Sequence, residues 1–216
     1  SGRLSQLKLL TFLIVCAPAL YWAFEIWADI PANPVNYIIK QSGDWSMRLM
    51  VAVLAVSPLR RLLRLNRLIL GRRMLGIAAL IYGLIHLLFY FVSQDWDWPL
   101  IIDGMLTALY LTTGYVALAL MLVLGLTSND WSIHTLGTNG WRRLHWIVYP
   151  AAILSLVHFL LEVRADGDEA AIIAGLLLYL FLFRGLRRAT GETRLSHLLI
   201  LAPICGVATL LLEAAY

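Results

Sequence analysis

Long runs of apolar residues alternate with short polar segments along almost the whole chain. The runs cover about residues 7–28, 45–63, 73–93, 103–126, 144–163, 169–184 and 195–215. An α-helix rises about 1.5 Å per residue, so a run of about 20 apolar residues can cross the roughly 30 Å hydrocarbon core of a bilayer. The pattern predicts an all-α protein, a polytopic bundle of seven transmembrane helices.

The composition agrees with this pattern and argues against a soluble domain. Of the 216 residues, 61% are hydrophobic and 14% are charged, whereas a soluble domain is about 45–50% apolar and about 25% charged. We therefore expect residues 1–216 to form a single transmembrane domain. The two cysteines, Cys16 and Cys205, fall inside apolar runs and do not form a metal-binding pattern.

The positions of the basic residues explain the net charge of +4, and we expect no nucleic-acid partner. If the N-terminus is cytoplasmic, then of the 17 lysines and arginines only Lys40, Arg48 and Arg164 fall on the outer side. Because basic loops stay in the cytoplasm, the sequence predicts a cytoplasmic N-terminus and, after seven spans, a C-terminus on the outer side. The arginine-rich segment 60–73 fits contact with membrane lipid or the docking of an acidic cytoplasmic electron donor.

Three histidines, His86, His145 and His158, lie inside the apolar runs. An ionisable side chain within the membrane marks a functional site by default, and neutral imidazole is a common axial ligand of haem iron. His86 lies 13 residues after Arg73 on the third run, and His158 lies 13 residues after His145 on the fifth. His86 and His158 therefore reach similar depths in the outer half of the membrane, and we expect them to be the two axial ligands of one b-type haem.

The inner level, near His145, has no second histidine; Arg72 and Arg73 occupy the corresponding depth. Three interpretations are open. An arginine or another unusual group completes a second haem; the second haem is five-coordinate or shared with a partner; or there is one haem only, and the arginines bind propionates or anionic lipid. On an ideal helix, a spacing of 13 residues makes the side chains of His145 and His158 point about 140° apart. Pro150 lies between them and can change this angle.

Other interpretations compete with iron ligation. Histidines in a helical bundle also form hydrogen bonds across helices, and the protein would then be a haem-free transporter or scaffold. Arg48, the one basic residue in the outer part of the second run, either pairs with a haem propionate or reaches the membrane surface.

Several short motifs follow one another along residues 30–185. The motifs are Pro34-Val35, Ser57-Pro58-Leu59-Arg60, Arg72-Arg73-Met74-Leu75-Gly76 with His86, Leu126-Thr127-Ser128, Leu136-Gly137, and Trp141-Arg142-Arg143-Leu144-His145 with Tyr149 and His158. In their order and spacing they resemble the MsrQ (YedZ) family of the ferric-reductase-like transmembrane superfamily. The resemblance implies that residues 30–185 form a haem-binding core. Residues 195–216 continue beyond this region as an additional helix.

The resemblance implies an electron carrier of the bacterial inner membrane. It implies that haem b is associated with His86, His145 and His158, that Arg72 faces His145, and that FMN is a candidate second cofactor. Electrons would come from a cytoplasmic flavin reductase or a quinone and pass to a periplasmic molybdopterin methionine sulfoxide reductase (MsrP-like). The alternative is a ferric-reductase-like enzyme that reduces a small periplasmic acceptor directly.

The chain carries neither a GxGxxG nor a P-loop motif for a nucleotide cofactor. We therefore expect the electron-transfer subunit of an oxidoreductase system rather than a stand-alone enzyme.

Overall fold

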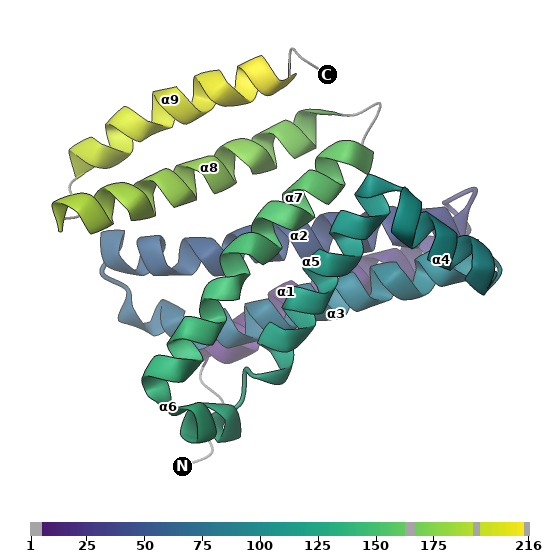
Figure 1. The fold of residues 1–216 in the computed structure, drawn as a ribbon, viewed down its shortest axis with the longest axis horizontal. Coiled ribbons are helices and arrows are strands. Elements are labelled where there is room, and N and C mark those ends of the chain that lie inside the picture. The colour runs from purple at the N-terminus through teal and green to yellow at the C-terminus, as the bar shows by residue number, and fades with distance from the viewer. Residues whose placement is uncertain (1–5, 163–166, 192–194, 214–216) are drawn as a thin grey trace.

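The computed structural model describes residues 6–162, 167–191 and 195–213. Within these residues the chain forms nine α-helices, two short 3₁₀ turns and no strand (Figure 1). The helices are α1 (Gln6–Trp27), α2 (Pro34–Leu62), α3 (Ile69–Ser93), α4 (Trp98–Thr107), α5 (Leu109–Leu126), α6 (Asp130–Leu144), α7 (Val148–Glu162), α8 (Gly167–Thr190) and α9 (Leu195–Glu213). The 3₁₀ turns are Asn66–Leu68 and His145–Ile147. The predicted all-α bundle is confirmed.

Five helical segments of the described residues are long and apolar enough to cross a membrane, so the protein is a multipass membrane protein. They are Gln6–Trp27, Asn66–Ser93, Leu109–Leu126, Asp130–Glu162 and Glu169–Thr190. These segments correspond to five of the seven predicted spans.

The second and seventh predicted spans are helical but do not meet the same criterion. The span at 45–63 lies in α2, which begins earlier because Asn33 caps it and Pro34 opens it. The added first half of α2 is polar, with Lys40 and Asp44. The span at 195–215 forms α9, of which Leu201–Leu210 ranks as a shorter apolar helix. Arg164 and residues 214–215 lie outside the described residues.

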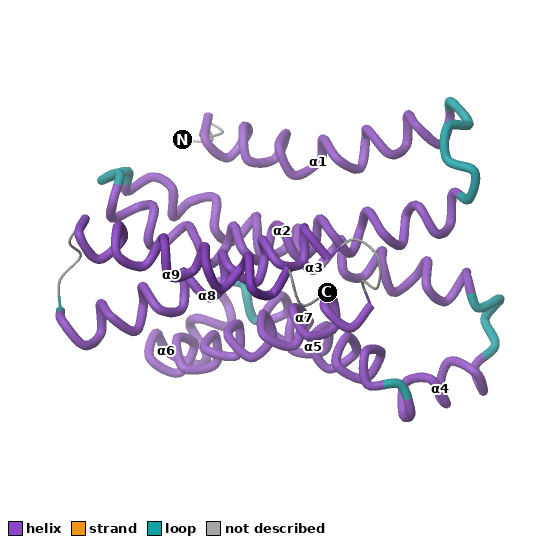
Figure 2. The backbone as a smooth tube through the Cα atoms, turned by 90° about the horizontal axis from the view of Figure 1, so that it is seen from above, coloured by secondary structure: helices purple, strands orange, loops and turns teal. Residues whose placement is uncertain are grey.

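Close packing joins the helices in pairs, α2 with α3, α5 with α7 and α8 with α9. Figures 1 and 2 show α8 and α9 side by side, and Figure 2 shows α1 along one side of the bundle. Ala79 on α3 and Ala151 and Ala152 on α7 are almost fully buried. Their small side chains let the helices around the bundle centre approach closely. The two helices that carry His86 and His158 are thus each paired with a different neighbour.

The fourth predicted span, 103–126, is wrong as a single helix. The chain breaks between α4 and α5 at Ala108, whose backbone is extended with φ −92° and ψ 109°. The Asp97 side chain accepts from the Leu100 N–H at 3.2 Å and starts α4 earlier than predicted. The Thr112 hydroxyl donates to the Met105 carbonyl at 2.6 Å. This side chain satisfies a carbonyl at the end of α4, which an apolar pattern cannot reveal.

The fifth predicted span, 144–163, does not begin as a regular α-helix. His145–Ile147 forms a 3₁₀ turn before α7. Pro150 offers no N–H to the Trp146 carbonyl four residues earlier, which weakens the α-helical ladder at this place. A 3₁₀ turn advances about 120° per residue rather than about 100°, so three residues reduce the angle between His145 and His158 from about 140° to about 80°. The ideal-helix angle is therefore wrong for this segment.

Candidate cofactor site

His86 from α3 and His158 from α7 line one cavity between α2, α3, α5 and α7. The cavity has a volume of about 570 Å³, and we call it the outer cavity. The two imidazole ring centres are 5.9 Å apart, and the ring planes meet at 82°. A metal–imidazole bond is about 2.0–2.1 Å long, so two imidazoles on one metal ion place their ring centres about 6 Å apart. The structure thus brings together the two histidines that the sequence placed at one depth.

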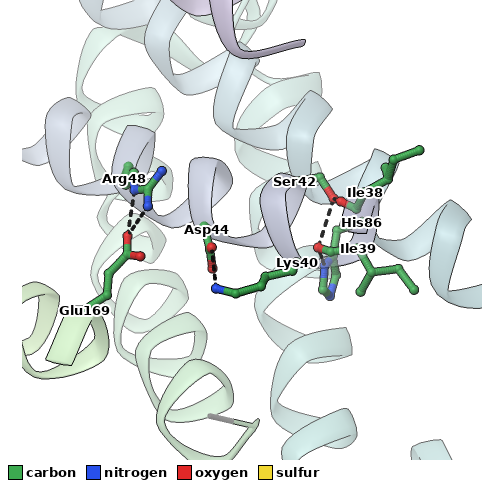
Figure 3. Close-up of polar contacts among 8 residues, drawn as sticks. All are labelled: Ile38, Ile39, Lys40, Ser42, Asp44, Arg48, His86 and Glu169. Carbon is green, nitrogen blue, oxygen red and sulfur yellow. Dashed lines mark hydrogen bonds and ion pairs between the residues drawn. The ribbon is translucent and has the colours of Figure 1, made fainter. Parts of the chain in front are cut away.

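Both rings are held at Nδ1 by a backbone carbonyl. The Nδ1 atom of His86 lies 2.9 Å from the Ile39 carbonyl oxygen on α2 (Figure 3). The Nδ1 atom of His158 lies 2.6 Å from the Tyr110 carbonyl oxygen on α5. A carbonyl can only accept, so the proton sits on Nδ1 and the Nε2 lone pair is left for a metal. Sequence reasoning missed these partners, because backbone acceptors have no signature in the residue pattern.

The rest of the outer cavity suits a flat apolar group with a polar edge. Its apolar wall includes Met47, Leu87, Leu118 and Phe159. The Tyr115 hydroxyl oxygen in the same wall is buried and has no hydrogen-bond partner among the described residues. An unpaired buried hydroxyl is costly. The cavity therefore fits haem, which brings both an apolar macrocycle and hydrogen-bond acceptors.

A second cavity, the inner cavity, has a volume of about 630 Å³ and contains His145 in its wall. Met50 and Met121 line both cavities, so the two are adjacent. The wall of the inner cavity is strongly cationic. Its arginines are Arg61, Arg72, Arg73, Arg142, Arg184, Arg187 and Arg188.

His145 is the one histidine of the inner cavity wall among the described residues. Its ring stacks on Trp141, with ring centres 3.8 Å apart and planes inclined by 30°. Its Nδ1 lies 3.2 Å from the Trp141 carbonyl oxygen, and its Nε2 lies 3.3 Å from the Ser128 hydroxyl. The Nε2 contact is long for a hydrogen bond, so a metal can displace the hydroxyl without a large loss.

The two arginines predicted near His145 differ in their surroundings. Arg73 donates to the Asp130 carboxylate at 2.9 Å and also contacts the Ser128 carbonyl. Arg72 is half-buried, and none of the ion pairs among the described residues includes it. A buried cation without a counter-charge is costly. Arg72 therefore suits an anionic group inside the inner cavity.

Arg48 lines neither cavity among the described residues. Its Nε and Nη2 atoms both lie 2.6 Å from Oε1 of Glu169, which joins α2 to α8 (Figure 3). Its guanidinium also lies over the Trp45 ring, 5.1 Å from the ring centre. Sequence reasoning offered a propionate or the membrane surface for Arg48 and missed Glu169, a partner 121 residues away.

We expect Arg48→Ala to leave the content of any bound cofactor unchanged. The pair is about one-third exposed, so its loss should cost about 1 kcal/mol or less of stability. Glu169→Gln is the matched control, because it breaks the same pair from the other side. Thermal unfolding and cofactor content of both variants check this. Cofactor loss in Arg48→Ala alone would restore the propionate interpretation.

Comparison with known proteins places the chain in a family. Residues 42–156 match the family described as "Ferric reductase like transmembrane component". The region contains His86 and His145, and His158 lies two residues beyond its end. The protein is thus a ferric-reductase-like transmembrane protein. No solved structure matches the chain.

Individual relatives narrow the class. The chain is 38% identical over 182 residues to a protein of Azospira oryzae, and the aligned region covers 83% of this chain and 78% of the relative. It is 35% identical over 175 residues to a protein of Rhodospirillum rubrum, and that aligned region covers 80% of this chain and 84% of the relative. Both relatives are named "Protein-methionine-sulfoxide reductase heme-binding subunit MsrQ". A protein of Caulobacter vibrioides with the same name is 32% identical over 177 residues. The chain belongs to the MsrQ family.

Proposed function

We propose that this protein is a b-type haem protein that carries electrons across the bacterial inner membrane. The donor is a flavin reductase or a quinone on the cytoplasmic side. The acceptor is a periplasmic molybdopterin methionine sulfoxide reductase (MsrP-like). The observation that carries the proposal is the pair His86 and His158, with ring centres 5.9 Å apart and both Nδ1 atoms on backbone carbonyls. The names of the relatives, which describe them as heme-binding subunits of a protein-methionine-sulfoxide reductase, support it.

The chain's own residues have three tasks at the outer cavity. His86 on α3 and His158 on α7 would hold the haem through Nε2, and the carbonyls of Ile39 and Tyr110 keep the protons on Nδ1. The apolar wall keeps water out. Haem held by both histidines would supply a one-electron carrier, and ligation by two imidazoles would suit electron transfer rather than oxygen chemistry.

We propose that the inner cavity is a second haem site. It is similar in volume to the outer cavity and adjoins it through Met50 and Met121. His145 offers one imidazole, and Arg72 faces the same space without an ion-pair partner among the described residues. Two adjacent sites at different depths would suit electron transfer across the membrane. The basic ends of the helices support a cytoplasmic position for the inner cavity.

Electron transfer through proteoliposomes tests the function. The vesicles enclose a purified MsrP-like enzyme with methionine sulfoxide, and a flavin reductase with NADH is added outside. We expect methionine to form in vesicles that contain this protein and not in empty vesicles. A membrane-impermeant ferric chelate enclosed in place of the enzyme tests the alternative. Reduction of the chelate alone, without methionine in the first assay, would favour the ferric-reductase-like function. Flavin analysis of the purified protein tests for FMN.

Tyr115→Phe is expected to weaken haem binding at the outer cavity by up to about tenfold, because a hydrogen bond contributes about 0.5–1.5 kcal/mol net. The reason is that the buried Tyr115 hydroxyl lacks a partner until the cavity is filled. Titration of haem into haem-free protein in detergent measures this. Tyr179→Phe on α8 is the control, because Tyr179 lines neither cavity. Equal affinity in both variants would show that haem does not use the Tyr115 hydroxyl.

A further inference from the structure

Each of the two cavity-facing imidazoles lies directly against a glycine of the neighbouring helix. A Cβ atom built on Gly43 of α2 would stand 3.0 Å from Nδ1 and 3.2 Å from Cε1 of His86. A Cβ atom built on Gly114 of α5 would stand 2.8 Å from Nδ1 and 3.0 Å from Cε1 of His158. The 2.8 Å separation at Gly114 is shorter than real Cβ contacts, so a larger residue there must displace the His158 imidazole. The 3.0 Å separation at Gly43 is tighter than most real Cβ contacts, so a larger residue there must push the His86 imidazole away by a few tenths of an ångström.

The glycine and the carbonyl that holds the histidine have the same spacing on both helices. His86 bonds to the carbonyl of Ile39, four residues before Gly43. His158 bonds to the carbonyl of Tyr110, four residues before Gly114. In an α-helix the Cα–Cβ bond tilts toward the N-terminus, so the side chain at position i+4 lies over the carbonyl of residue i. A glycine at i+4 leaves that carbonyl open to a second donor.

We propose that Gly43 and Gly114 are positioning residues for the two haem ligands. Each glycine uncovers one helix carbonyl, and that carbonyl fixes the tautomer and the ring plane of its histidine. Together they set the near-perpendicular planes of His86 and His158, which meet at 82°. The role of these glycines toward haem rests on the proposed function, whereas their effect on the histidine tautomers does not.

Two consequences follow for iron held by these histidines. An imidazole that donates from Nδ1 to an acceptor is a more basic ligand, and a more basic ligand stabilises the ferric state. Loss of the hydrogen bond from Nδ1 to the carbonyl should therefore raise the midpoint potential of the haem.

The angle between two axial imidazole planes also controls the shape of the low-spin ferric EPR signal. Perpendicular planes give one large g value, and parallel planes give a rhombic signal.

Gly104→Ala provides a control for crowding as such. A Cβ atom on Gly104 would stand 3.0 Å from Cδ1 of Leu111, the same separation as at Gly43, and Gly104 lines neither cavity. The contact there is a flexible methyl group rather than an imidazole. A purely structural role of glycine in helix packing predicts similar behaviour of all three alanine variants.

The first measurement is nitrogen NMR on haem-free protein labelled with ¹⁵N-histidine, with His86→Ala and His158→Ala for assignment. We expect His86 and His158 to be protonated at Nδ1 in the starting protein and in Gly104→Ala. We expect a tautomer mixture for His86 in Gly43→Ala and for His158 in Gly114→Ala. Unchanged tautomers in the two variants would overturn the proposal, whether or not the protein binds haem.

The second measurement uses the haem-loaded protein. We expect Gly43→Ala and Gly114→Ala to have a higher midpoint potential and an altered EPR signal, with the larger change in Gly114→Ala. Gly104→Ala should match the unmodified protein in both. Changed tautomers together with an unaltered potential and EPR signal would show that the glycines orient histidines that do not ligate haem. That result would overturn the proposed function of the site separately.

Discussion

His158→Ala is expected to remove the haem of the outer cavity and to lower electron transfer to an outer acceptor by more than a hundredfold. The substitution takes away one of the two imidazoles that face each other in that cavity. Changes to the hydrogen-bond partners of metal ligands alone cost about 10–100-fold, so loss of the ligand itself should cost more. His86→Ala should behave in the same way. Haem quantitation and the low-spin EPR signal measure the effect.

His134→Ala is the control for this prediction. His134 is exposed on α6 and lines neither cavity, so its loss should leave haem content and electron transfer unchanged. A His158→Ala protein that keeps its full haem content and low-spin signal would contradict the assignment of His158. Loss of haem in His134→Ala as well would point to general instability rather than ligation.

The second large effect is expected for His145→Ala, which should lower the haem content from two per chain to one. The outer cavity is formed by other residues, so the remaining haem should keep its low-spin signal. Arg72→Gln should weaken the same inner site because it removes a half-buried cation of that cavity that forms no ion pair among the described residues. Arg72→Lys should retain most of the haem because it keeps the charge. Haem quantitation with a redox titration separates the two sites.

The outcome of these variants decides between the interpretations of the inner cavity. Full haem content in His145→Ala would contradict a second haem there. A content of one in both the unmodified protein and His145→Ala would leave the arginines to bind other anions, such as lipid. Equal loss in Arg72→Gln and Arg72→Lys would show that the guanidinium shape, and not only its charge, is needed.

The fold could be predicted from the sequence where apolar runs are long and uninterrupted. The runs at 7–28 and 73–93 correspond closely to helices because burial in lipid forces every backbone group to bond within the segment. The break at Ala108 could not be predicted, since no proline or glycine stands at that position. It depends on the Thr112 hydroxyl and the Met105 carbonyl, a contact that the apolar pattern does not record.

For the site, the sequence could predict only the depth of the histidines along their helices. Counting residues along two helices put His86 and His158 at one level, and their ring centres lie 5.9 Å apart. The direction of each ring was not predictable, because it depends on carbonyls of Ile39 and Tyr110 in other helices. The pairing of Arg48 with Glu169 was missed for the same reason, since it joins segments distant in the chain.

The reduced-minus-oxidised optical spectrum of the unmodified protein, with haem quantitation, is the decisive test of whether this protein is a b-type haem protein. The protein is purified in mild detergent from cells supplied with ample haem. We expect b-type absorbance bands and two haems per chain, with the outer haem bound between His86 and His158. Protein that is folded but shows no haem absorbance would contradict haem binding and favour a haem-free transporter or scaffold.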